Sequence, residues 1–169
     1  VAVRSVLYSV KMSAGGLRKM SSWVFAAYGV GLNRSEMVKH CPTAKPIGAT
    51  ELKNFRLAFR GGNACAVATI EKAKGGGVPA LLWEITSQDE EALDRWIGVP
   101  EMYRKDIVKV RLNGAAIDAF VYMLIGNKPP NKPSAFYYST LLEGYKAAGF
   151  DTEILKAAVQ ANSADAATS

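Results

Sequence analysis

A short glycine-containing stretch is the first place where residue types and spacing could support chemistry. The apolar run Trp23–Tyr28 leads directly into Gly29 and Gly31, and Asn33 then opens a helix. Glycine permits positive φ angles and lets backbone N–H groups come close to a ligand. A strand–loop–helix unit of this kind can hold an anion or stabilise an oxyanion, although a purely structural turn would also explain the two glycines.

The other residues with chemical potential form no recognisable ligand set. His40, the single histidine, precedes Cys41, and Cys65 follows 24 residues later with no second pair. This spacing does not match a zinc motif, so we expect two ordinary thiols, no metal and no other cofactor. Free thiols are typical of reducing compartments, and we therefore expect an intracellular, cytoplasmic location.

The composition predicts one globular domain between two terminal segments. The chain has 169 residues, is 49% hydrophobic and carries a formal net charge of +6, which is enough chain for a full core. Residues 1–22 contain four basic side chains and no acidic one, which predicts a basic arm of the transit-peptide type or an N-terminal extension. We assign residues 23–161 to the domain and residues 162–169 to a small polar tail.

Charge and hydropathy disfavour two classes of partner. The basic residues form no runs interleaved with aromatic side chains, which argues against nucleic-acid binding. No apolar run reaches the ~18 residues that a membrane span requires, and no secretory signal pattern is present. We expect protein partners instead, contacted through the terminal segments.

Hydrophobic periodicity and turn residues divide the domain into strands and helices. The predicted strands cover 23–28, 45–60, 65–70, 78–86, 103–112 and 115–124. The predicted helices cover 34–40, 87–97, 134–145 and 153–160. A tight loop is expected at the triple glycine 75–77, and a type I′ hairpin at Asn113-Gly114. Strands in both hairpin and crossover relation, with inserted helices, predict an α+β fold with a mixed sheet or small barrel.

Two of the predicted helices begin with capping patterns. Asn33 is followed by Glu36, and Ser87 is followed by Glu90, each at a spacing of three residues. In such a pair the first side chain accepts a hydrogen bond from the first turn, and the acid reaches back to the cap. We therefore expect Asn33 and Ser87 to be N-caps.

A series of short motifs lies between residues 23 and 151. They are Phe25–Asn33, Phe55–Phe59, Ala68–Ile70, Val78–Ile85, Leu93–Pro100, Tyr103–Lys105, Pro133-Ser134, Tyr137-Tyr138 and Leu142–Tyr145. In this order they resemble the γ-glutamylcyclotransferase-like family, also called AIG2-like or BtrG-like. The resemblance covers roughly three quarters of the chain and implies the α+β fold of that family.

The resemblance implies an activity and a site. Members of this family release 5-oxoproline from γ-glutamyl amines or peptides such as glutathione, when the substrate α-amino group attacks its γ-carbonyl. A carboxylate removes a proton from that amine, and N–H donors of a Tyr-Gly-Ser-Asn-Leu loop stabilise the oxyanion. By resemblance, the substrate loop here consists of Tyr28, Gly29, Val30, Gly31 and Leu32.

Three positions depart from the family pattern at the implied site. The family base is the glutamate of a Leu-Asp-x-x-Glu-Gly pattern, and Ile97 occupies that position here. Val30 replaces the loop serine, and Gly31 replaces the loop asparagine. An isoleucine cannot accept a proton, and loss of a positioned base typically lowers the rate by ~10²–10⁴. Asp94, on the same predicted helical face as Ile97, and Glu101 are the candidate substitute bases.

Functions of different classes follow from this pattern. The leading hypothesis is a pseudoenzyme, a γ-glutamylcyclotransferase-like domain that serves as a binding or structural module in protein–protein interaction. Because such genes occur in bacteria and their phages, an accessory role in a larger particle such as a phage virion fits this hypothesis. The alternative is an active cyclotransferase with a relocated base, and a sensor that binds a γ-glutamyl small molecule lies between the two. The leading hypothesis predicts that Ile97→Glu with Val30→Ser and Gly31→Asn raises turnover from background.

Overall fold

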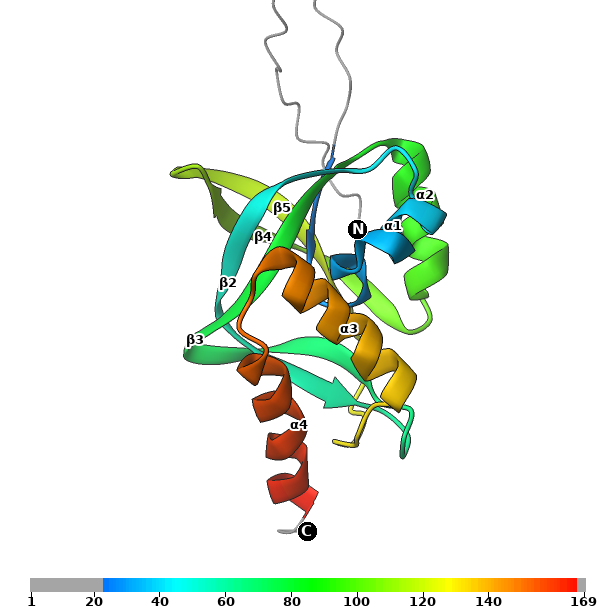
Figure 1. Cartoon of the computed structure of the whole chain (residues 1–169), viewed down its shortest axis with the longest axis vertical. Helices are drawn as coiled ribbons and strands as arrows, with labels where there is room; N and C mark the ends of the chain where they lie inside the picture. Colours follow the sequence, from blue (N-terminus) through cyan, green and yellow to red (C-terminus); the bar gives the residue numbers. More distant parts are fainter. Residues whose placement is uncertain (1–22, 167–169) are drawn as a thin grey trace, which may run out of the picture.

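The computed structural model describes residues 23–166, with side chains described as far as Ala161. The predicted basic arm 1–22 lies outside the described residues. The described chain forms an α+β domain built on a five-stranded mixed sheet, as the sequence predicts (Figure 1).

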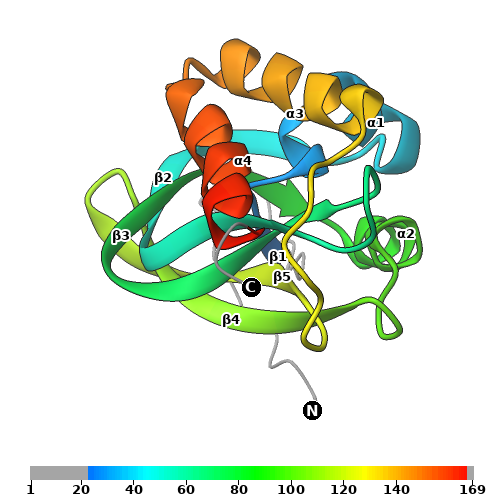
Figure 2. The same ribbon diagram turned by 90° about the horizontal axis from the view of Figure 1, so that it is seen from below.

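The sheet has the strand order β2-β3-β1-β5-β4. The strands are β1 (Trp23–Ala27), β2 (Lys45–Arg60), β3 (Val67–Ile85), β4 (Tyr103–Leu112) and β5 (Ala115–Leu124). β1 pairs antiparallel with β3 and parallel with β5, so it lies in the middle of the sheet. Within the described residues no ladder joins the edge strands β2 and β4, and the curved sheet therefore stays open (Figure 2).

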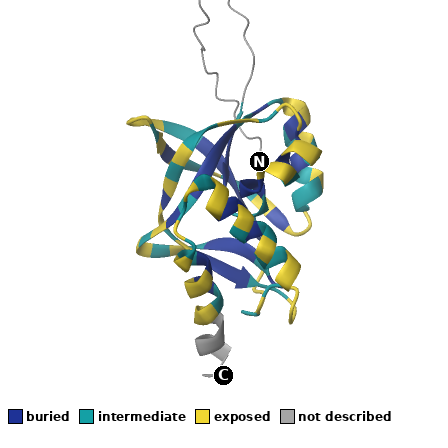
Figure 3. Cartoon of the chain, in the orientation of Figure 1, coloured by how far each residue is buried: buried dark blue, intermediate teal, exposed yellow. Residues whose placement is uncertain are grey.

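β1 is central because its side chains suit no exposed position. Val24, Phe25, Ala26 and Ala27 are all buried, and a strand covered on both faces has a continuous apolar sequence rather than an alternating one. Figure 3 shows the buried positions concentrated on the strands in the middle of the molecule, with the helices exposing their outer faces. The loop that follows β1 consequently begins inside the core.

The predicted loop at the triple glycine 75–77 is wrong, because β3 continues through it and pairs with β2 on both sides. A Cβ on Gly76 would lie 2.5 Å from the carbonyl oxygen of Phe55 in β2. Opposite the glycines β2 has a register irregularity, where Asn54 adopts φ 63 and its Oδ1 accepts a hydrogen bond from Gly75 N–H at 3.1 Å. The glycines therefore permit a close approach of two strands and do not end one.

Helices cover the sheet from several sides. They are η1 (Val30–Leu32, a 3₁₀ turn), α1 (Arg34–His40), α2 (Ser87–Ile97), α3 (Ala135–Ala148) and α4 (Glu153–Ala166). α3 contacts η1, α4 packs on β2, and α1 contacts α2 (Figure 1). α4 continues to Ala166, so the first residues of the predicted polar tail are helical. No helix in the described part of the chain combines the length and apolar character needed to cross a membrane.

Two local predictions on either side of the sheet are confirmed. Asn33 is the N-cap of α1, and its Oδ1 accepts a hydrogen bond from Glu36 N–H at 3.2 Å. Asn113 and Gly114 have φ 50 and φ 81, as a type I′ turn requires, and they join β4 to β5.

The predicted N-cap of α2 is wrong by one residue. Thr86, not Ser87, is the N-cap, and it forms a capping box with Asp89. Glu90 is therefore not part of the cap, and its carboxylate binds Lys105 of β4 instead. Thr86 and Asp89 have the same three-residue spacing as Ser87 and Glu90, so the local sequence contains both capping patterns and the structure uses the first.

Candidate functional site

The loop between β1 and α1 is held by contacts to its backbone. Trp83 Nε1 of β3 donates a buried hydrogen bond of 3.0 Å to the carbonyl of Gly31. Leu32 N–H and Asn33 N–H bond back to Gly29 and Val30 at 3.0 Å and form η1. The first N–H groups of any helix lack an intrahelical acceptor, so η1 keeps backbone donors beside Val30.

Gly31 serves close packing, and neither glycine of this loop has the positive φ that the sequence predicts. Neither glycine adopts a positive φ, and Gly29 has φ −120. A Cβ on Gly31 would lie 2.8 Å from Phe25 Cε1 and 3.0 Å from Ala27 Cβ. The loop therefore sits directly on the aromatic core under β1, and the space at this position excludes a side chain.

α3 fixes the far end of the loop. A Cβ on Gly144 would lie 2.7 Å from Leu32 Cβ and 2.8 Å from the Leu32 carbonyl carbon, so the helix touches the loop backbone. Asn33 is 5% exposed, and its Nδ2 donates to the Thr140 carbonyl and to Glu143 Oε2, both at 3.1 Å. One side chain thus caps α1 and attaches it to α3.

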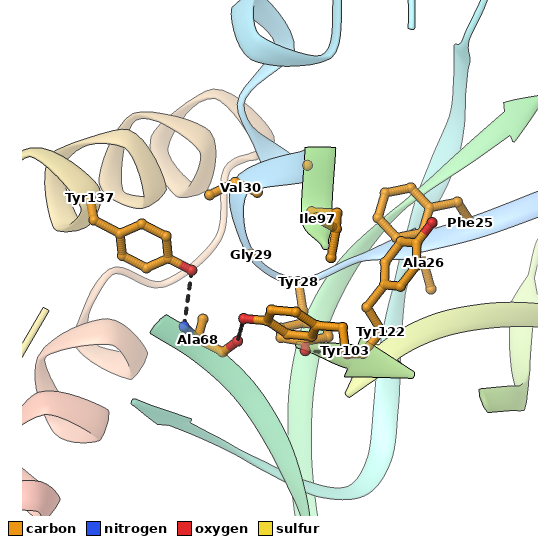
Figure 4. A pocket seen from close by; sticks show the side chains of 11 residues that line it. Phe25, Ala26, Tyr28, Gly29, Val30, Ala68, Ile97, Tyr103, Tyr122 and Tyr137 are labelled. Carbon is orange, nitrogen blue, oxygen red and sulfur yellow. Dashed lines mark hydrogen bonds between the residues drawn. The ribbon is translucent and has the colours of Figure 1, made fainter. Parts of the chain in front are cut away.

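A small cavity lies beneath the loop, and tyrosines from several elements surround it (Figure 4). Its volume is ≈ 30 Å³, which is room for about one or two water molecules. It is lined by Phe25, Ala26, Tyr28, Gly29, Val30, Gly31, Ala68, Ile97, Tyr103, Tyr122 and Tyr137. No carboxylate, imidazole or amine is among these lining residues of the described chain.

Every tyrosine hydroxyl at the cavity already has a hydrogen-bond partner. Tyr137 Oη accepts from Ala68 N–H at 2.9 Å, and Tyr103 Oη donates to the Ala68 carbonyl at 2.8 Å. Tyr28 Oη donates to the carbonyl of Tyr122. Tyr122 Oη donates to Asp94 Oδ1 at 2.6 Å. Figure 4 shows the first two bonds converging on one residue of β3.

Burial keeps the hydroxyl groups of these tyrosines protonated. Burial raises the pKa of Tyr137 to about 12, and it raises the pKa of Tyr28, Tyr103 and Tyr122 further. For Tyr122 the neighbouring Asp94 carboxylate adds to the effect of burial and also raises the pKa. All four side chains remain neutral phenols at pH 7, so none can take a proton from an ammonium group.

Ile97 reaches the cavity from the C-terminal end of α2, where Gly98 with φ 99 ends the helix. The same side chain, together with Val30, Tyr103 and Tyr137, also borders an outer groove of ≈ 330 Å³. These residues therefore form the boundary between the small inner cavity and the surface. The boundary is aliphatic at Ile97 and Val30, the two positions at which the resemblance implies a glutamate and a serine in the family.

The candidate substitute bases lie elsewhere. Asp94 does not line the cavity: its Oδ1 accepts from Tyr122, and its Oδ2 lies 2.9 Å from Lys105 Nζ. That ammonium also binds Glu90 and is only 12% exposed, so the carboxylates of Glu90 and Asp94 together neutralise a shielded cation. Glu101 is exposed in the loop after α2 and borders neither the cavity nor the outer groove.

The cysteines and the histidine do not line the cavity. Cys41 is buried, its Sγ donates to the Asp89 carbonyl at 3.4 Å, and burial raises its pKa to about 11. Cys65 is an exposed free thiol. The His40 ring stacks on Trp96 with 4.1 Å between ring centroids. Among the described residues, none of the three lines the cavity.

The loop and Ile97 are site candidates that the sequence predicts. Tyr103, Tyr122 and Tyr137 line the cavity without having been predicted as site residues. Tyr103 and Tyr137 belong to the motifs that carry the family resemblance, and that membership was the available signal. Tyr122 had no signal beyond its place in a predicted strand. Its position at the cavity depends on the parallel pairing of β1 with β5 through Phe25 and Phe120.

Comparison with known proteins gives a consistent result. The family model described as "Gamma-glutamyl cyclotransferase, AIG2-like" matches residues 25–146. A solved structure described as "Gamma-glutamyl cyclotransferase" is 25% identical, with a TM-score of 0.69, and the match covers 81% of this chain and 86% of that one. The chain matches no curated protein sequence.

Two further solved structures have the same fold at lower identity. The human protein described as uncharacterized protein loc79017 is 24% identical, with a TM-score of 0.69, and the match covers 81% of this chain and 86% of that one. YkqA from Bacillus subtilis is 20% identical, with a TM-score of 0.70, and the match covers 82% of this chain and 54% of that one.

Proposed function

Since this chain belongs to the γ-glutamyl cyclotransferase, AIG2-like family, we propose that it is a pseudoenzyme of that family. It keeps the fold and the substrate loop as a binding or structural module and does not release 5-oxoproline. The observation that carries this proposal is the lining of the cavity, which has Ile97 at the base position and contains no carboxylate.

The chemistry of the family reaction explains why this lining matters. The substrate α-amino group is mostly protonated at neutral pH and attacks a carbonyl only after losing a proton. Neutral tyrosines cannot accept that proton, and Ile97 cannot stabilise the ammonium before it reacts. The backbone donors of η1 would still suit an oxyanion, but oxyanion stabilisation alone does not supply a base.

The size of the cavity supports the same proposal. A volume of ≈ 30 Å³ is too small for a γ-glutamyl group, while the outer groove of ≈ 330 Å³ is bordered by the aliphatic side chains of Val30 and Ile97. The groove is lined mainly by apolar and aromatic side chains, and its one carboxylate among the described residues, Glu36, pairs with Lys39 at 2.8 Å. A small γ-glutamyl compound is therefore a weaker candidate partner than a protein.

The biological setting that we propose rests on the sequence. A basic arm at residues 1–22 and a polar segment at the other end suit attachment to protein partners, as in an accessory component of a larger particle such as a phage virion. The cytoplasm or such a particle is the corresponding location. The arm itself lies outside the described residues.

The direct test is an assay of 5-oxoproline release from glutathione and γ-glutamyl dipeptides. We expect release at background level, and unchanged background in Asp94→Asn and Glu101→Gln. Turnover comparable with that of an active family member would overturn the proposal. Loss of that turnover in one of the two variants would identify a relocated base.

Thermal shift with the same γ-glutamyl compounds distinguishes a module without a small ligand from a sensor. We expect no increase in melting temperature at millimolar ligand. A saturable increase in the wild type that Ile97→Trp removes would instead establish a sensor that uses the outer groove.

A further inference from the structure

The two edge strands of the sheet border one continuous region of surface. A groove of ≈ 390 Å³ is lined from both strands, by Thr50 and Lys53 of β2 and by Lys109 and Arg111 of β4. A second groove of ≈ 340 Å³ continues along β4 past Ile107. We call the two grooves together the seam; it is distinct from the cavity under the Tyr28 loop.

The seam presents backbone groups that have no strand partner. At one end the two edges meet, since a Cβ on Gly48 of β2 would lie 2.6 Å from Leu112 Cδ1 of β4. Beyond that contact, the ladders of the described residues join β2 to β3 and β4 to β5, and β2 has one further isolated bridge, from Arg60 to Pro130. An edge strand with unpaired N–H and C=O groups is a template for an added strand.

The side chains along the seam are mainly basic. Among the described residues, five cationic and two acidic side chains line the two grooves: Lys53, Lys72, Arg104, Lys109 and Arg111 with Glu51 and Asp106. Arg104 pairs with Asp106 at 3.3 Å, and Lys109 pairs with Asp118 at 2.6 Å. Lys53 and Lys72 are exposed and form no ion pair within the described chain, so they are available to a negatively charged partner.

One apolar side chain interrupts the charges. Ile107, in the middle of β4, is 48% exposed and borders the second groove together with Phe55 of β2. Successive side chains of a strand point to opposite faces. Ile107 points to the same face of β4 as Lys109 and Arg111, and Phe55 is the cross-strand partner of Lys72, so apolar and basic side chains share a face of the seam. A strand laid along the seam would therefore meet both kinds of side chain with one set of its own side chains.

We propose that the seam binds an extended, acidic segment of another protein, which adds to the sheet as a strand. The unpaired edges supply main-chain hydrogen bonds, and the lysines and arginines select for acidic side chains. The termini of this chain do not suit the site, because residues 1–22 contain four basic side chains and no acid, and residues 162–169 contain one acid. A second copy would bring the same positive edge against the first, and a nucleic acid would leave the strand edges unpaired.

The dimensions fit a short peptide. The part of β4 that lines the seam runs from Arg104 to Arg111, about 25 Å of extended chain, which corresponds to a partner strand of about eight residues. This inference deepens the proposed binding role but does not depend on the loss of catalysis. Peptide binding and 5-oxoproline release are separate readouts, so one can fail while the other stands.

The experiment uses the full chain and a fluorescein-labelled acetylated peptide of alternating Glu and Val, about eight residues long. We expect saturable binding by fluorescence anisotropy that weakens as salt is raised. The double variant Lys53→Glu/Lys72→Glu should bind roughly tenfold more weakly. The matched control Lys128→Glu/Lys146→Glu makes the same change in net charge at exposed lysines outside the seam and should bind as the wild type does.

Two further peptides and one measurement test strand addition itself. A Lys–Val peptide should not bind, and the Glu–Val peptide with alternate amides N-methylated should lose at least tenfold in affinity because it cannot form the ladder. Hydrogen exchange should slow in β2 and β4 when the Glu–Val peptide binds. No binding at millimolar peptide, equal binding of the N-methylated peptide, or equal weakening in the control variant would overturn the proposal.

Discussion

Ile97 occupies the one position from which a carboxylate at the end of α2 would reach the tyrosine-lined cavity. Its side chain borders both the inner cavity and the outer groove. Asp94, three residues earlier, is already bound to Tyr122 and Lys105, so it cannot turn toward the cavity without leaving a shielded ammonium with one fewer partner. Under the proposed function, the presence of a base at the cavity would therefore depend on the residue at position 97.

Replacement of that side chain is the sharpest single-residue test. We expect Ile97→Glu combined with Val30→Ser to raise 5-oxoproline release above background, because the carboxylate would enter the cavity wall beside the donors of η1. The matched control is Ile97→Gln with Val30→Ser, which has the same shape but no base. A positioned base should separate the two variants by roughly 10² or more in rate. Equal rates in two folded variants would contradict the expectation.

The third substitution suggested by the sequence, Gly31→Asn, is excluded from this test by the structure. Its Cβ would lie 2.8 Å from Phe25 Cε1, so the loop or the aromatic ring would have to move.

Helix α3 and the loop beneath it behave as one unit. Gly144 allows the backbone of α3 to contact Leu32, and Asn33 connects the loop to Thr140 and Glu143. The Leu142–Tyr145 motif thus has a packing role, because the contact at Gly144 fixes the position of the loop relative to α3. A change on the inner face of α3 should consequently alter the cavity without touching its lining.

Gly144→Ala tests this coupling. In a helix with free space alanine would stabilise by up to about 1 kcal/mol, whereas the clash at Leu32 should destabilise by about 1–3 kcal/mol. The measurement is the free energy of unfolding by urea, with Ser139→Ala on the exposed face of α3 as the control. A stabilised Gly144→Ala variant would show that the loop and helix can separate freely.

β2 and β3 are joined on the surface by an ion-pair cluster at Glu71. Its carboxylate binds Arg60 Nε at 2.8 Å and Arg56 at 2.9 Å. Hydrogen bonding to Arg60 is the largest effect that lowers the pKa of Glu71 below its ordinary value of 4.5, and Arg56 adds to it. A carboxyl group with a lowered folded-state pKa stabilises the protein above its unfolded pKa, and this contribution is lost as pH falls through the folded value.

We therefore expect unfolding free energy to fall as pH drops below about 4.5, and Glu71→Gln to flatten that decline. Because the carboxylate is partly exposed, the difference should be at most about 1 kcal/mol. Arg60→Gln should flatten the same part of the profile, and the double variant should add little to either single one. Additive effects would mean that the two side chains act independently.

Hydrogen bonds to the backbone of Ala68 connect β3 to both β4 and α3. β4 bonds to its carbonyl through Tyr103, and α3 bonds to its N–H through Tyr137, so three elements distant in sequence meet at one residue of β3. Ala68 is 2% exposed, so either backbone group would be buried without a partner if its tyrosine lost the hydroxyl. The walls of the cavity are therefore joined to one another by hydrogen bonds at Ala68.

Tyr103→Phe and Tyr137→Phe should each lower the unfolding free energy by about 1–3 kcal/mol. The control is Tyr138→Phe, next in α3, whose hydroxyl forms no hydrogen bond within the described residues. A double-mutant cycle measured by urea unfolding should show coupling between the two hydroxyls. If the control variant is destabilised as much as Tyr137→Phe, loss of the Ala68 bond is not the cause.

Local chemistry explains which parts of the fold could be predicted. The limits of α1, β2, β4 and β5, the Asn33 cap and the Asn113-Gly114 turn follow from contacts within a few residues, which the sequence states directly. The resemblance indicated the family and its fold, and it implied that Ile97 corresponds to the family base. The error at 75–77 arises because the triple glycine accommodates the neighbouring strand β2. The error at Ser87 arises because Thr86 and Asp89 form a second capping pair at the same spacing, one residue earlier.

By itself, the sequence predicted that a glycine loop follows a buried central strand and, through the family resemblance, that Ile97 stands at the position of the family base. Only the tertiary structure decided what surrounds those residues. It brought four tyrosines from separate elements around one small cavity and bound Asp94 to Lys105. It also placed basic side chains along β2 and β4, two edge strands that no ladder joins within the described residues. Such arrangements arise from long-range pairing and packing, whose partners are distant in the chain and leave no periodic trace in it.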